Sequence, residues 1–295
     1  MSATIIDGKK IAGEIMEEVR REAGLLKRQR GTTPGLAFVL VGENPASMVY
    51  VRSKGKACAE MGFSSVTETL SEQISQPDLL KHVEQLNSDP QIHGILVQLP
   101  LPKHIDEQRI IEAIDYRKDV DGFHPVNVGR LVIGLDGFRP CTPAGVQELL
   151  VRSGNDPSGK HVVVVGRSNI VGKPVMNILL QKQRGANAVV TIVHTGAPDI
   201  SRYTRDADIV VAALGKPEAF TGDMLKPGCV VIDVGINRVP DPGAKGGYRL
   251  VGDVHFPSAS MVAGAITPVP GGVGPMTIAM LMKNTLKAAI MSMPG

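Results

Sequence analysis

The fold is decided by one stretch, Val162-Val-Val-Val-Gly166-Arg-Ser-Asn-Ile-Val-Gly172-Lys-Pro174. Four consecutive valines are typical of a buried strand, because β-branched side chains favour an extended backbone and pack well in a sheet. Two glycines bound the turn that follows, and Pro174 stands where a helix can begin. The stretch therefore predicts a strand, a turn and a helix in direct succession.

The predicted turn has features of a phosphate site. The N-terminus of its helix would present unpaired N–H groups and the positive end of the helix dipole, and both stabilise a phosphate. Gly166 and Gly172 match the outer glycines of the dinucleotide-binding fingerprint, but Ser168 stands in place of the middle glycine. Two interpretations stay open at this point: a phosphate-binding turn, and a βα turn without a ligand.

The composition indicates a globular protein of two domains. The chain has 295 residues, of which 43% are hydrophobic, so it can bury a sizeable core. The formal net charge is only +3, aromatic residues make up 3% and Trp is absent, which argues against a nucleic-acid-binding protein. One basic cluster is interpreted as the solvated face of a helix. It consists of Arg20, Arg21, Lys27, Arg28 and Arg30.

Cysteine and histidine usage favours a reducing compartment and no metal. Cys58, Cys141 and Cys229 are far apart and never form a Cys-x-x-Cys pair, which argues against a disulfide framework or a zinc site. The seven histidines show no spacing typical of metal ligands, so no metal is expected. We see neither a signal-peptide pattern nor ~18 uninterrupted apolar residues, and therefore expect a cytoplasmic protein without a membrane span.

Helices and strands are predicted to alternate along the first half of the chain. Asp7 is expected to cap a helix that carries an apolar stripe of Ile11, Ile15 and Val19 and ends at Gly31. The elements expected next are a strand at 36–41, a helix from Pro45 to about Met61, a helix at 77–87, a strand at 94–99 and a polar loop at 119–125. This alternation predicts an α/β domain whose parallel sheet gathers ligands at the carboxyl ends of its strands.

The second half of the chain predicts a Rossmann-like domain. Its expected elements are a helix opened by Thr142-Pro143, strands at 162–165, 189–193, 208–213, 229–234 and 248–254, and helices near 172–183 and 199–206. A last helix at 275–291 has an apolar face that needs a partner surface, and we expect it to pack back on the first domain. The predicted domains are residues 1–141 with 277–295, and residues 142–276.

Polar side chains of the first domain are candidates for a ligand site. Tyr50 and Lys54 are four residues apart, hence on one face of the predicted helix. Gln98 ends an apolar strand, so it is either a satisfied buried amide or part of a site. Asp119 and Asp121 add carboxylates, and amine, amide and carboxylate together would hold a polar heterocycle. A solvated or snorkelling Lys54 is the simpler alternative.

The second domain favours NADP over NAD. The strand at 189–193 is followed by His194 and Thr195, where an NAD site usually places an acid for the ribose hydroxyls. Arg167 directly follows the first glycine of the turn, and its guanidinium suits a ribose phosphate. The alternative for Arg167 is a solvated turn residue.

Six stretches form an ordered set along the chain. They are Tyr50-Val-Arg-Ser-Lys54, Val97-Gln-Leu-Pro-Leu-Pro102, Lys118-Asp-Val-Asp-Gly-Phe123, Gly166-Arg-Ser-Asn-Ile-Val-Gly-Lys-Pro174, Asp233-Val-Gly-Ile-Asn237 and Pro268-Val-Pro-Gly-Gly-Val-Gly-Pro-Met-Thr277. This set resembles the bacterial-type methylenetetrahydrofolate dehydrogenase/methenyltetrahydrofolate cyclohydrolase family over essentially the whole chain. A glycine pair alone is a weak signal, whereas six ordered motifs are a strong one.

The resemblance implies a bifunctional enzyme of one-carbon metabolism. It would oxidise 5,10-methylenetetrahydrofolate with NADP and hydrolyse the 5,10-methenyl product to 10-formyltetrahydrofolate. It also implies a homodimer, with folate between a catalytic and a nucleotide domain in each subunit. Lys54 would be the central catalytic group, and Gln98 would orient it and tune its protonation. Tyr50 would stack on the folate, and Asp121 would grip the pterin ring.

The family pattern also implies a cofactor site. Gly166, Arg167 and Ser168 would lie at the phosphates and ribose, Thr195 at the ribose phosphate, and Ile236 near the nicotinamide. The segment from Pro270 to Thr277 would border both ligands. Its implied substrate contacts are Pro270, Gly271, Gly272 and Thr277.

One departure from the family pattern concerns the cofactor. Many members have serine and then a basic residue after the histidine of this strand, whereas here Thr195-Gly196-Ala197 follow His194. The hydroxyl is kept and the basic residue is lost, which weakens the basis for preferring NADP over NAD.

Two other functions stay open from the residues alone. One is a two-domain NAD(P)-dependent dehydrogenase of an amino acid or hydroxy acid, with Lys54 as base and no cyclohydrolase step. The other is an NADP-sensing module without catalysis. An acid that grips a pterin and an amide that orients a lysine have no obvious use on a small acid, which favours the folate enzyme.

Overall fold

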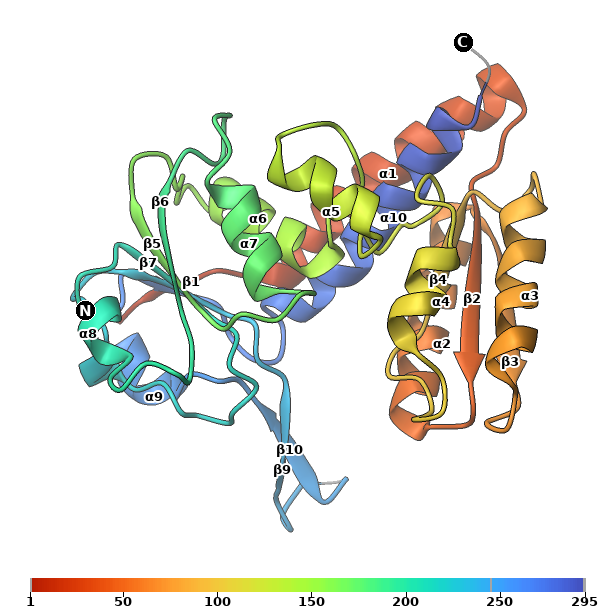
Figure 1. Ribbon diagram of the computed structural model, residues 1–295. Coiled ribbons are helices and arrows are strands. Elements are labelled where there is room, and N and C mark those ends of the chain that lie inside the picture. The colour runs from red at the N-terminus through yellow and green to blue at the C-terminus, as the bar shows by residue number, and fades with distance from the viewer. Residues whose placement is uncertain (1, 245, 294–295) are drawn as a thin grey trace. The chain divides into compact units, whose positions relative to one another are not determined.

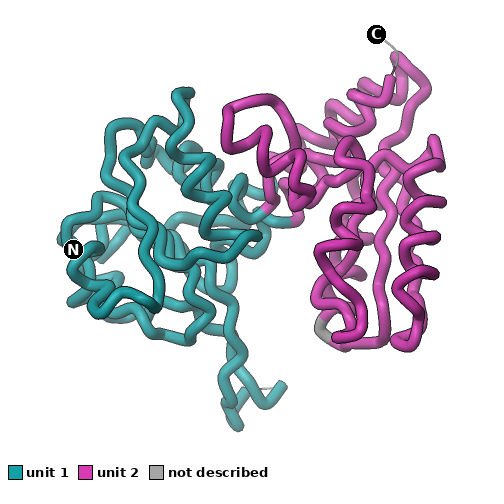
Figure 2. The backbone as a smooth tube through the Cα atoms, in the orientation of Figure 1, with its two compact units in different colours: residues 1–13, 142–277 teal, residues 14–141, 278–295 magenta. Residues whose placement is uncertain are grey.

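The computed structural model describes residues 2–244 and 246–293, and the chain divides into two compact units (Figure 2). Unit 1 comprises residues 1–13 and 142–277, and unit 2 comprises residues 14–141 and 278–295. The predicted two-domain α/β organisation is confirmed. The expected boundary differs at the N-terminus, because β1 (Thr4–Ile5) pairs in parallel with β11 (Ala265–Ile266) and so joins the sheet of unit 1.

Unit 2 is built on a parallel sheet of three strands in the order β3-β2-β4 (Figure 1). The central strand β2 (Gly35–Val41) is buried along its whole length. Alternate residues Ala37, Val39 and Val41 pack in one apolar cluster with residues of α3 (Gln76–Ser88) and α4 (Glu107–Ala113). Leu36, Phe38 and Leu40 point the other way and are buried too, as expected of a strand covered on both faces.

Three elements of unit 2 lie outside the sequence expectations: β3 (Ser64–Leu70), α4, and α5 (Pro125–Val132). Strand β3 is a sheet edge with mostly exposed side chains, so it has no apolar pattern and is specified by backbone pairing with β2. Helix α5 begins directly after the predicted polar loop. His124 caps it, because its Nδ1 accepts the Val126 N–H at 3.1 Å.

Unit 1 has a parallel sheet of six strands in the order β1-β11-β8-β7-β5-β6. The bounds of its remaining strands are β5 His161–Val165, β6 Val189–Val193, β7 Ile209–Ala212 and β8 Val230–Asp233. Its helices are α6 (Cys141–Arg152, shared with unit 2), α7 (Gly172–Leu179), α8 (Ser201–Thr204), the 3-10 turn Gly222–Met224 and α9 (Phe256–Ser260). A separate hairpin is formed by β9 (Asn237–Pro240) and β10 (Tyr248–Val251).

The direction of chain progression in this sheet reverses at β5. Strand β6 lies on one side of β5, and β7 followed by β8 lies on the other. The four valines of β5 are fully buried, as the sequence predicts. The point of reversal in such a sheet is where ligands bind, beyond the carboxyl ends of the strands.

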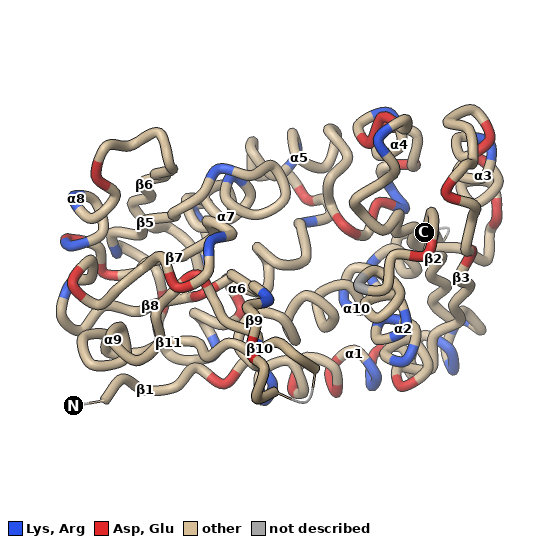
Figure 3. The backbone as a smooth tube through the Cα atoms, turned by 90° about the horizontal axis from the view of Figure 1, so that it is seen from below, with Lys and Arg blue, Asp and Glu red and all other residues tan. Residues whose placement is uncertain are grey.

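Helix α1 (Gly8–Arg30) confirms the predicted first helix. Asp7 Oδ1 accepts the Lys10 N–H at 3.0 Å, and the apolar stripe of Ile11, Ile15 and Val19 is buried. The basic cluster at residues 20–30 is exposed and interspersed with acidic residues along the helix (Figure 3). Within the described part of the chain, no helix combines the length and apolarity required to span a bilayer.

Helix α2 (Pro45–Met61) and the C-terminal helix α10 (Val273–Met291) are also where the sequence places them. The predicted packing of the last helix on the first domain is confirmed, because residues 278–293 belong to unit 2. Asn284 Nδ2 donates to Val120 O at 2.7 Å and to Arg139 O at 3.0 Å, and Met282 Sδ contacts Cys58 Sγ at 3.8 Å. A buried amide therefore anchors α10 to the loop between α4 and α5 and to the segment before α6.

Replacing this anchor should destabilise the protein. We expect Asn284→Ala to lower the free energy of unfolding by about 1–3 kcal/mol, because the Val120 and Arg139 carbonyl groups lose the amide that donates to both of them. Thr285→Val is the matched control: Thr285 is also buried, but its hydroxyl donates to Leu281 O one turn earlier in the same helix. Urea denaturation measures both variants, and equal losses would contradict the anchoring role of Asn284.

Candidate functional site

Lys54 and Gln98 meet at the carboxyl end of β4 (Gly94–Val97) in unit 2. Lys54 Nζ donates to Gln98 Oε1 at 3.1 Å, and Gln98 Nε2 donates to Leu99 O at 2.8 Å. The Gln98 backbone N–H donates to Val39 O of the neighbouring strand at 2.9 Å, so the sheet fixes the residue that carries the amide. The amine of Lys54 is thus partly buried and directed, which argues against a merely solvated lysine.

A buried carboxylate organises the loop between α4 and α5. Asp119 is 2% exposed and accepts the backbone N–H groups of Gly122, Phe123 and His124 at 2.8–3.3 Å, together with Asn127 Nδ2 at 2.9 Å. Burial raises the pKa of Asp119, and the hydrogen bonds from Asn127 and the backbone counteract that shift. With these donors, Asp119 holds the loop in place and is not a candidate for substrate contact.

Asp121 lies two residues further along the same loop and has a different environment. The segment pairs in parallel with β4 through Ile95 and Asp119, so the residues after Asp119 run toward the end of β4 where Gln98 lies. Burial raises the pKa of Asp121 to about 6, the positive charge of Lys54 lowers it, and the charge of Asp119 raises it further. Asp121 therefore places a carboxyl group beside the Lys54 amine, and the protonation of this carboxyl group changes near neutral pH.

Tyr50 completes a group that we name the Lys54 cluster: Tyr50, Lys54, Gln98 and Asp121. Tyr50 lies one helical turn before Lys54 on α2 and is 48% exposed, so its ring is free to contact a ligand. Cys141 lies within electrostatic range of Asp121 and Lys54 and is deeply buried, and burial raises the pKa of its thiol. The cluster offers an amine for proton transfer, an amide that orients it, a carboxyl group for paired N–H donors and an aromatic face.

In unit 1, the turn between β5 and α7 has the geometry that the glycines predict. Gly166 has a φ of +135°, and a Cβ there would overlap with Ala213 O of the neighbouring strand's extension. A Cβ on Gly172 would overlap with Gly166 O, so both positions require glycine for close packing. Ser168 Oγ accepts the N–H groups of Val171 and Gly172 at 3.1 and 3.3 Å, which fixes the start of the helix in place of a middle glycine.

Arg167, Thr195 and Ile236 are exposed beyond the carboxyl ends of β5, β6 and β8, respectively. Parallel strands bring these ends to one edge of the sheet, so residues far apart in sequence share that edge. The glycine turn and the exposed arginine fit a dinucleotide phosphate, whose negative charge needs N–H groups and a cation.

The segment from Pro270 to Thr277 is held against the start of α1 within unit 1. The Lys9 N–H donates to Gly271 O at 3.1 Å, and a Cβ on Gly8 would overlap with Gly272 O. The hydroxyl groups of Thr277 and Thr142 lie 2.8 Å apart. The structure thus gives these residues a defined backbone, and their predicted contact with substrate stays a prediction.

The sequence analysis assigned no role to two buried carboxyl groups at the carboxyl edge of the unit 1 sheet. Asp233 is quoted above only as part of a motif, and Asp253 follows β10 without any recognised pattern. Burial raises the pKa of Asp233 to about 7, and backbone N–H groups of Val254, Asp253 and Gly235 counteract the shift. Asp233 could have been recognised from the sequence as an acid at the end of an apolar strand. Asp253 follows β10, and no sequence pattern marks it.

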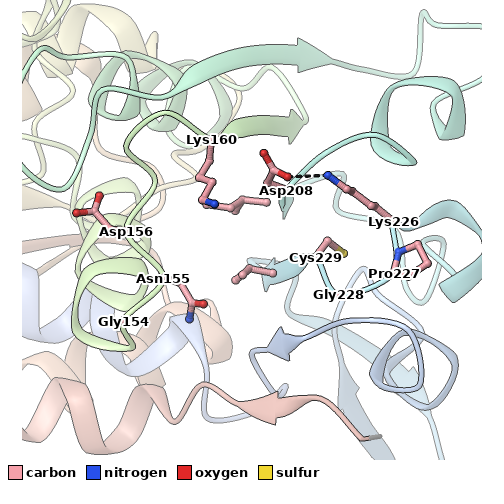
Figure 4. A pocket seen from close by; sticks show the side chains of 11 residues that line it. Gly154, Asn155, Asp156, Lys160, Asp208, Lys226, Pro227, Gly228 and Cys229 are labelled. Atoms are coloured by element: carbon pink, nitrogen blue, oxygen red, sulfur yellow. Dashed lines mark hydrogen bonds and ion pairs between the residues drawn. The ribbon is translucent and has the colours of Figure 1, made fainter.

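A cavity of about 370 Å³ lies at the opposite edge of the same sheet (Figure 4). It is lined by residues at the amino ends of β7 and β8 and by Lys160, which precedes β5, and it contains the ion pair of Lys226 Nζ and Asp208 Oδ1 at 2.7 Å. The predicted cofactor residues are absent from its lining. In residues 2–244 and 246–293, no group of three or more His, Cys, Asp and Glu side chains is placed to hold a metal ion.

The raised pKa of Asp121 predicts a pH-dependent stability cost. Its folded-state pKa of about 6 exceeds the ordinary value of 3.8, so the folded state loses stability as the pH rises through this interval and stays less stable above it. We expect Asp121→Asn to be more stable than wild type by roughly 1–3 kcal/mol at pH 7.5 and nearly equal at pH 4. Urea denaturation at both pH values decides this, since a pH-independent difference would exclude ionisation as the cause.

Comparison with known proteins shows which family the chain resembles over its length. Residues 6–121 match the sequence model for the tetrahydrofolate dehydrogenase/cyclohydrolase catalytic domain, and residues 140–293 match that for its NAD(P)-binding domain. The bifunctional protein FolD of Syntrophus aciditrophicus is 59% identical, with 99% of each chain covered. The same-named protein of Moorella thermoacetica is 60% identical over 98% of this chain and 99% of that protein.

Solved structures extend the likeness to three dimensions. The bifunctional FolD enzyme of Campylobacter jejuni has a TM-score of 0.93 at 48% identity, covering 99% of this chain and 100% of that one. The Trypanosoma brucei methylenetetrahydrofolate dehydrogenase-cyclohydrolase, solved with NADP and an inhibitor, also has a TM-score of 0.93, at 44% identity and 99% coverage of both chains. With both of its domain models matched and its full length covered by such relatives, the chain belongs to the tetrahydrofolate dehydrogenase/cyclohydrolase family.

Proposed function

We propose that the chain catalyses two successive steps of one-carbon metabolism. The first is the NADP-dependent oxidation of 5,10-methylenetetrahydrofolate to 5,10-methenyltetrahydrofolate, and the second is hydrolysis of that product to 10-formyltetrahydrofolate. The observation that carries the proposal is the Lys54 amine held by Gln98 beside Asp121, in a chain of this family. Bound NADP would supply the hydride acceptor for the first step.

The role proposed for Lys54 is proton transfer in the hydrolytic step. The methenyl carbon is electrophilic because the positive charge is shared with its two nitrogens, and water adds to it with loss of a proton. An amine within hydrogen-bond reach of that water would take up the proton and return one to the leaving nitrogen. The hydrogen bond to Gln98 Oε1 restricts the amine to one direction, which lowers the entropic cost of reaching the reactive geometry.

Asp121 and Tyr50 are proposed to bind the pterin end of the folate. Adjacent N–H donors on the pterin edge match the two oxygens of a carboxylate. The exposed ring of Tyr50 would stack on the flat heterocycle. A pterin-binding acid next to an oriented lysine distinguishes this function from a dehydrogenase of a small amino acid or hydroxy acid, for which the structure offers no supporting observation.

The cofactor is proposed to bind at the carboxyl edge of the unit 1 sheet. Gly166 and Ser168 would present the turn to the phosphates, Arg167 and Thr195 would bind the ribose phosphate, and Ile236 would contact the nicotinamide. Ser168, Arg167, Thr195 and Ile236 are exposed beyond neighbouring strands, which supports this assignment. Pro270, Gly271, Gly272 and Thr277 are proposed as substrate contacts on the basis of the family pattern.

The homodimer stays a prediction from the family resemblance, and the cytoplasmic location stays a prediction from the sequence. One feature supports self-association: β3 is an edge strand of unit 2 with mostly exposed side chains. Such an edge carries unpaired backbone groups and is a natural pairing surface for another chain. We therefore propose that the dimer surface includes this edge.

Lys54→Met tests the proposed function. Wild type should form NADPH from methylenetetrahydrofolate and should hydrolyse methenyltetrahydrofolate. The variant should lose the hydrolysis by at least about a hundredfold, in the range typical for loss of a proton-transfer group. Its NADP affinity should stay near wild type, because the cofactor residues belong to unit 1. Absence of NADPH formation by wild type with both NADP and NAD would refute the function, and normal hydrolysis by the variant would refute only the role of Lys54.

Arg167→Ala tests the phosphate assignment. Removal of a charged hydrogen bond to the ribose phosphate should weaken NADP binding by ~1.5–3 kcal/mol while NAD binding changes little. Lys173→Ala is a suitable control on the same turn, since Lys173 Nζ donates to Asn169 Oδ1 at 2.7 Å. Isothermal titration with both dinucleotides measures the effect, and equal weakening of NAD and NADP would contradict the assignment.

A further inference from the structure

Two buried aspartates lie at the carboxyl edge of the unit 1 sheet and have no part in the function proposed above. Asp233 is the last residue of β8 and is 3% exposed, and Asp253 comes two residues after β10 and is fully buried. Buried carboxyl groups are costly unless hydrogen-bonded, so their donors indicate what they hold in place.

The donors to Asp253 come from two different loops. Its Oδ2 accepts the backbone N–H groups of Leu214 at 2.6 Å and Gly215 at 2.8 Å, in the loop after β7. Its Oδ1 accepts Asn237 Nδ2 at 2.9 Å, in the segment after β8. One side chain therefore ties together the connections that follow two adjacent strands.

Asp233 holds Asp253 in turn. Its Oδ1 accepts the N–H groups of Gly235 and Asp253, both at 3.0 Å, and its Oδ2 accepts the Val254 N–H at 3.0 Å. A Cβ on Gly235 would overlap with the Asp253 carboxyl, and a Cβ on Gly252 would overlap with that of Asp233. Both glycines are thus required for the two acids to reach their donors.

The consequence concerns Ile236, which is 46% exposed between two residues held by these acids. On one side of Ile236, the Gly235 backbone N–H donates to Asp233. On the other side, the side-chain amide of Asn237 donates to Asp253. The loop after β7 is fixed at the same time, directly behind Ala213, which packs against Gly166 of the phosphate turn. The pair of acids therefore holds two connections of the proposed cofactor edge, and the phosphate turn lies directly against one of them.

We propose that Asp253 is a positioning residue for the dinucleotide. By joining the loops after β7 and β8, it sets the placement of Ile236 and of the Leu214-Gly215 backbone before the cofactor binds. The inference rests on the proposed NADP-dependent function. It predicts that loss of Asp253 impairs the dehydrogenase step and leaves the hydrolytic step unaffected, because the Lys54 cluster proposed for that step lies in unit 2.

The experiment compares Asp253→Ala with Asp253→Asn. The alanine removes every acceptor, so we expect the NADP KM to rise by at least about tenfold, with methenyltetrahydrofolate hydrolysis within about twofold of wild type. The asparagine keeps an oxygen for Leu214 and Gly215, and its amide would donate to Asn237 after a flip of that side chain. It should therefore restore the NADP KM to within about threefold of wild type.

A readout without cofactor separates positioning from activity. In the apoprotein, hydrogen–deuterium exchange of a peptide containing Leu214 and Gly215 should be faster in Asp253→Ala than in wild type and near wild type in Asp253→Asn. Unchanged exchange and unchanged NADP KM in the alanine variant would overturn the proposal. So would an equal loss in both variants, since that would assign the effect to charge and not to hydrogen-bond acceptance.

A milder variant covers the case in which Asp253→Ala fails to fold and loses both activities. Asn237→Ala removes only the link from Asp253 to the Ile236 segment, and we expect the NADP KM to rise about three- to tenfold with hydrolysis retained. An unchanged NADP KM in this variant would overturn the proposal. Failure of the proposed function itself would be visible separately, as a wild-type protein that neither reduces NADP nor binds it in titration calorimetry.

Discussion

Each unit depends on a buried carboxyl group that accepts several backbone N–H groups where a parallel strand ends. In unit 2 this group is Asp119, which forms an isolated parallel bridge with Ile95 of β4, and in unit 1 it is the pair Asp233 and Asp253. Beyond the carboxyl end of a parallel strand the chain turns away from the sheet, so its backbone N–H groups no longer have partners in the sheet and need other ones. A buried acid satisfies several of them at once, and the loop that results carries the residues proposed for function.

The two aspartates of the loop between α4 and α5 have different roles because their surroundings differ. Asp119 and Asp121 are the same residue type two positions apart. Asp119 receives backbone and Asn127 donors and organises the loop, whereas burial raises the pKa of Asp121 to about 6 beside Lys54. A carboxyl group that is costly to ionise is unfavourable for stability, but it is well suited to bind a ligand that brings its own N–H donors.

The fold and much of the candidate site could be predicted because the signals are local. The valines of β5, the stripe of α1 and the glycines around the phosphate turn each specify a backbone conformation or a buried face over a few residues. The Tyr50 and Lys54 pair follows from helical spacing alone. Strand β3 could not be predicted in this way, because its exposed side chains give no pattern and its pairing with β2 is a backbone interaction.

Local pattern thus sufficed for the order of helices and strands, the α/β class and the residue types of the site. Tertiary structure shows that the Lys54 amine meets the Gln98 amide, as the family resemblance implied, and it alone decided that Asp253 meets loops some 16 to 39 positions away in the chain. It also placed residues 1–13 in unit 1, through the pairing of β1 with β11. The reason is that hydrogen bonds between distant segments depend on strand order and register, and neither is encoded in the short-range periodicity of the chain.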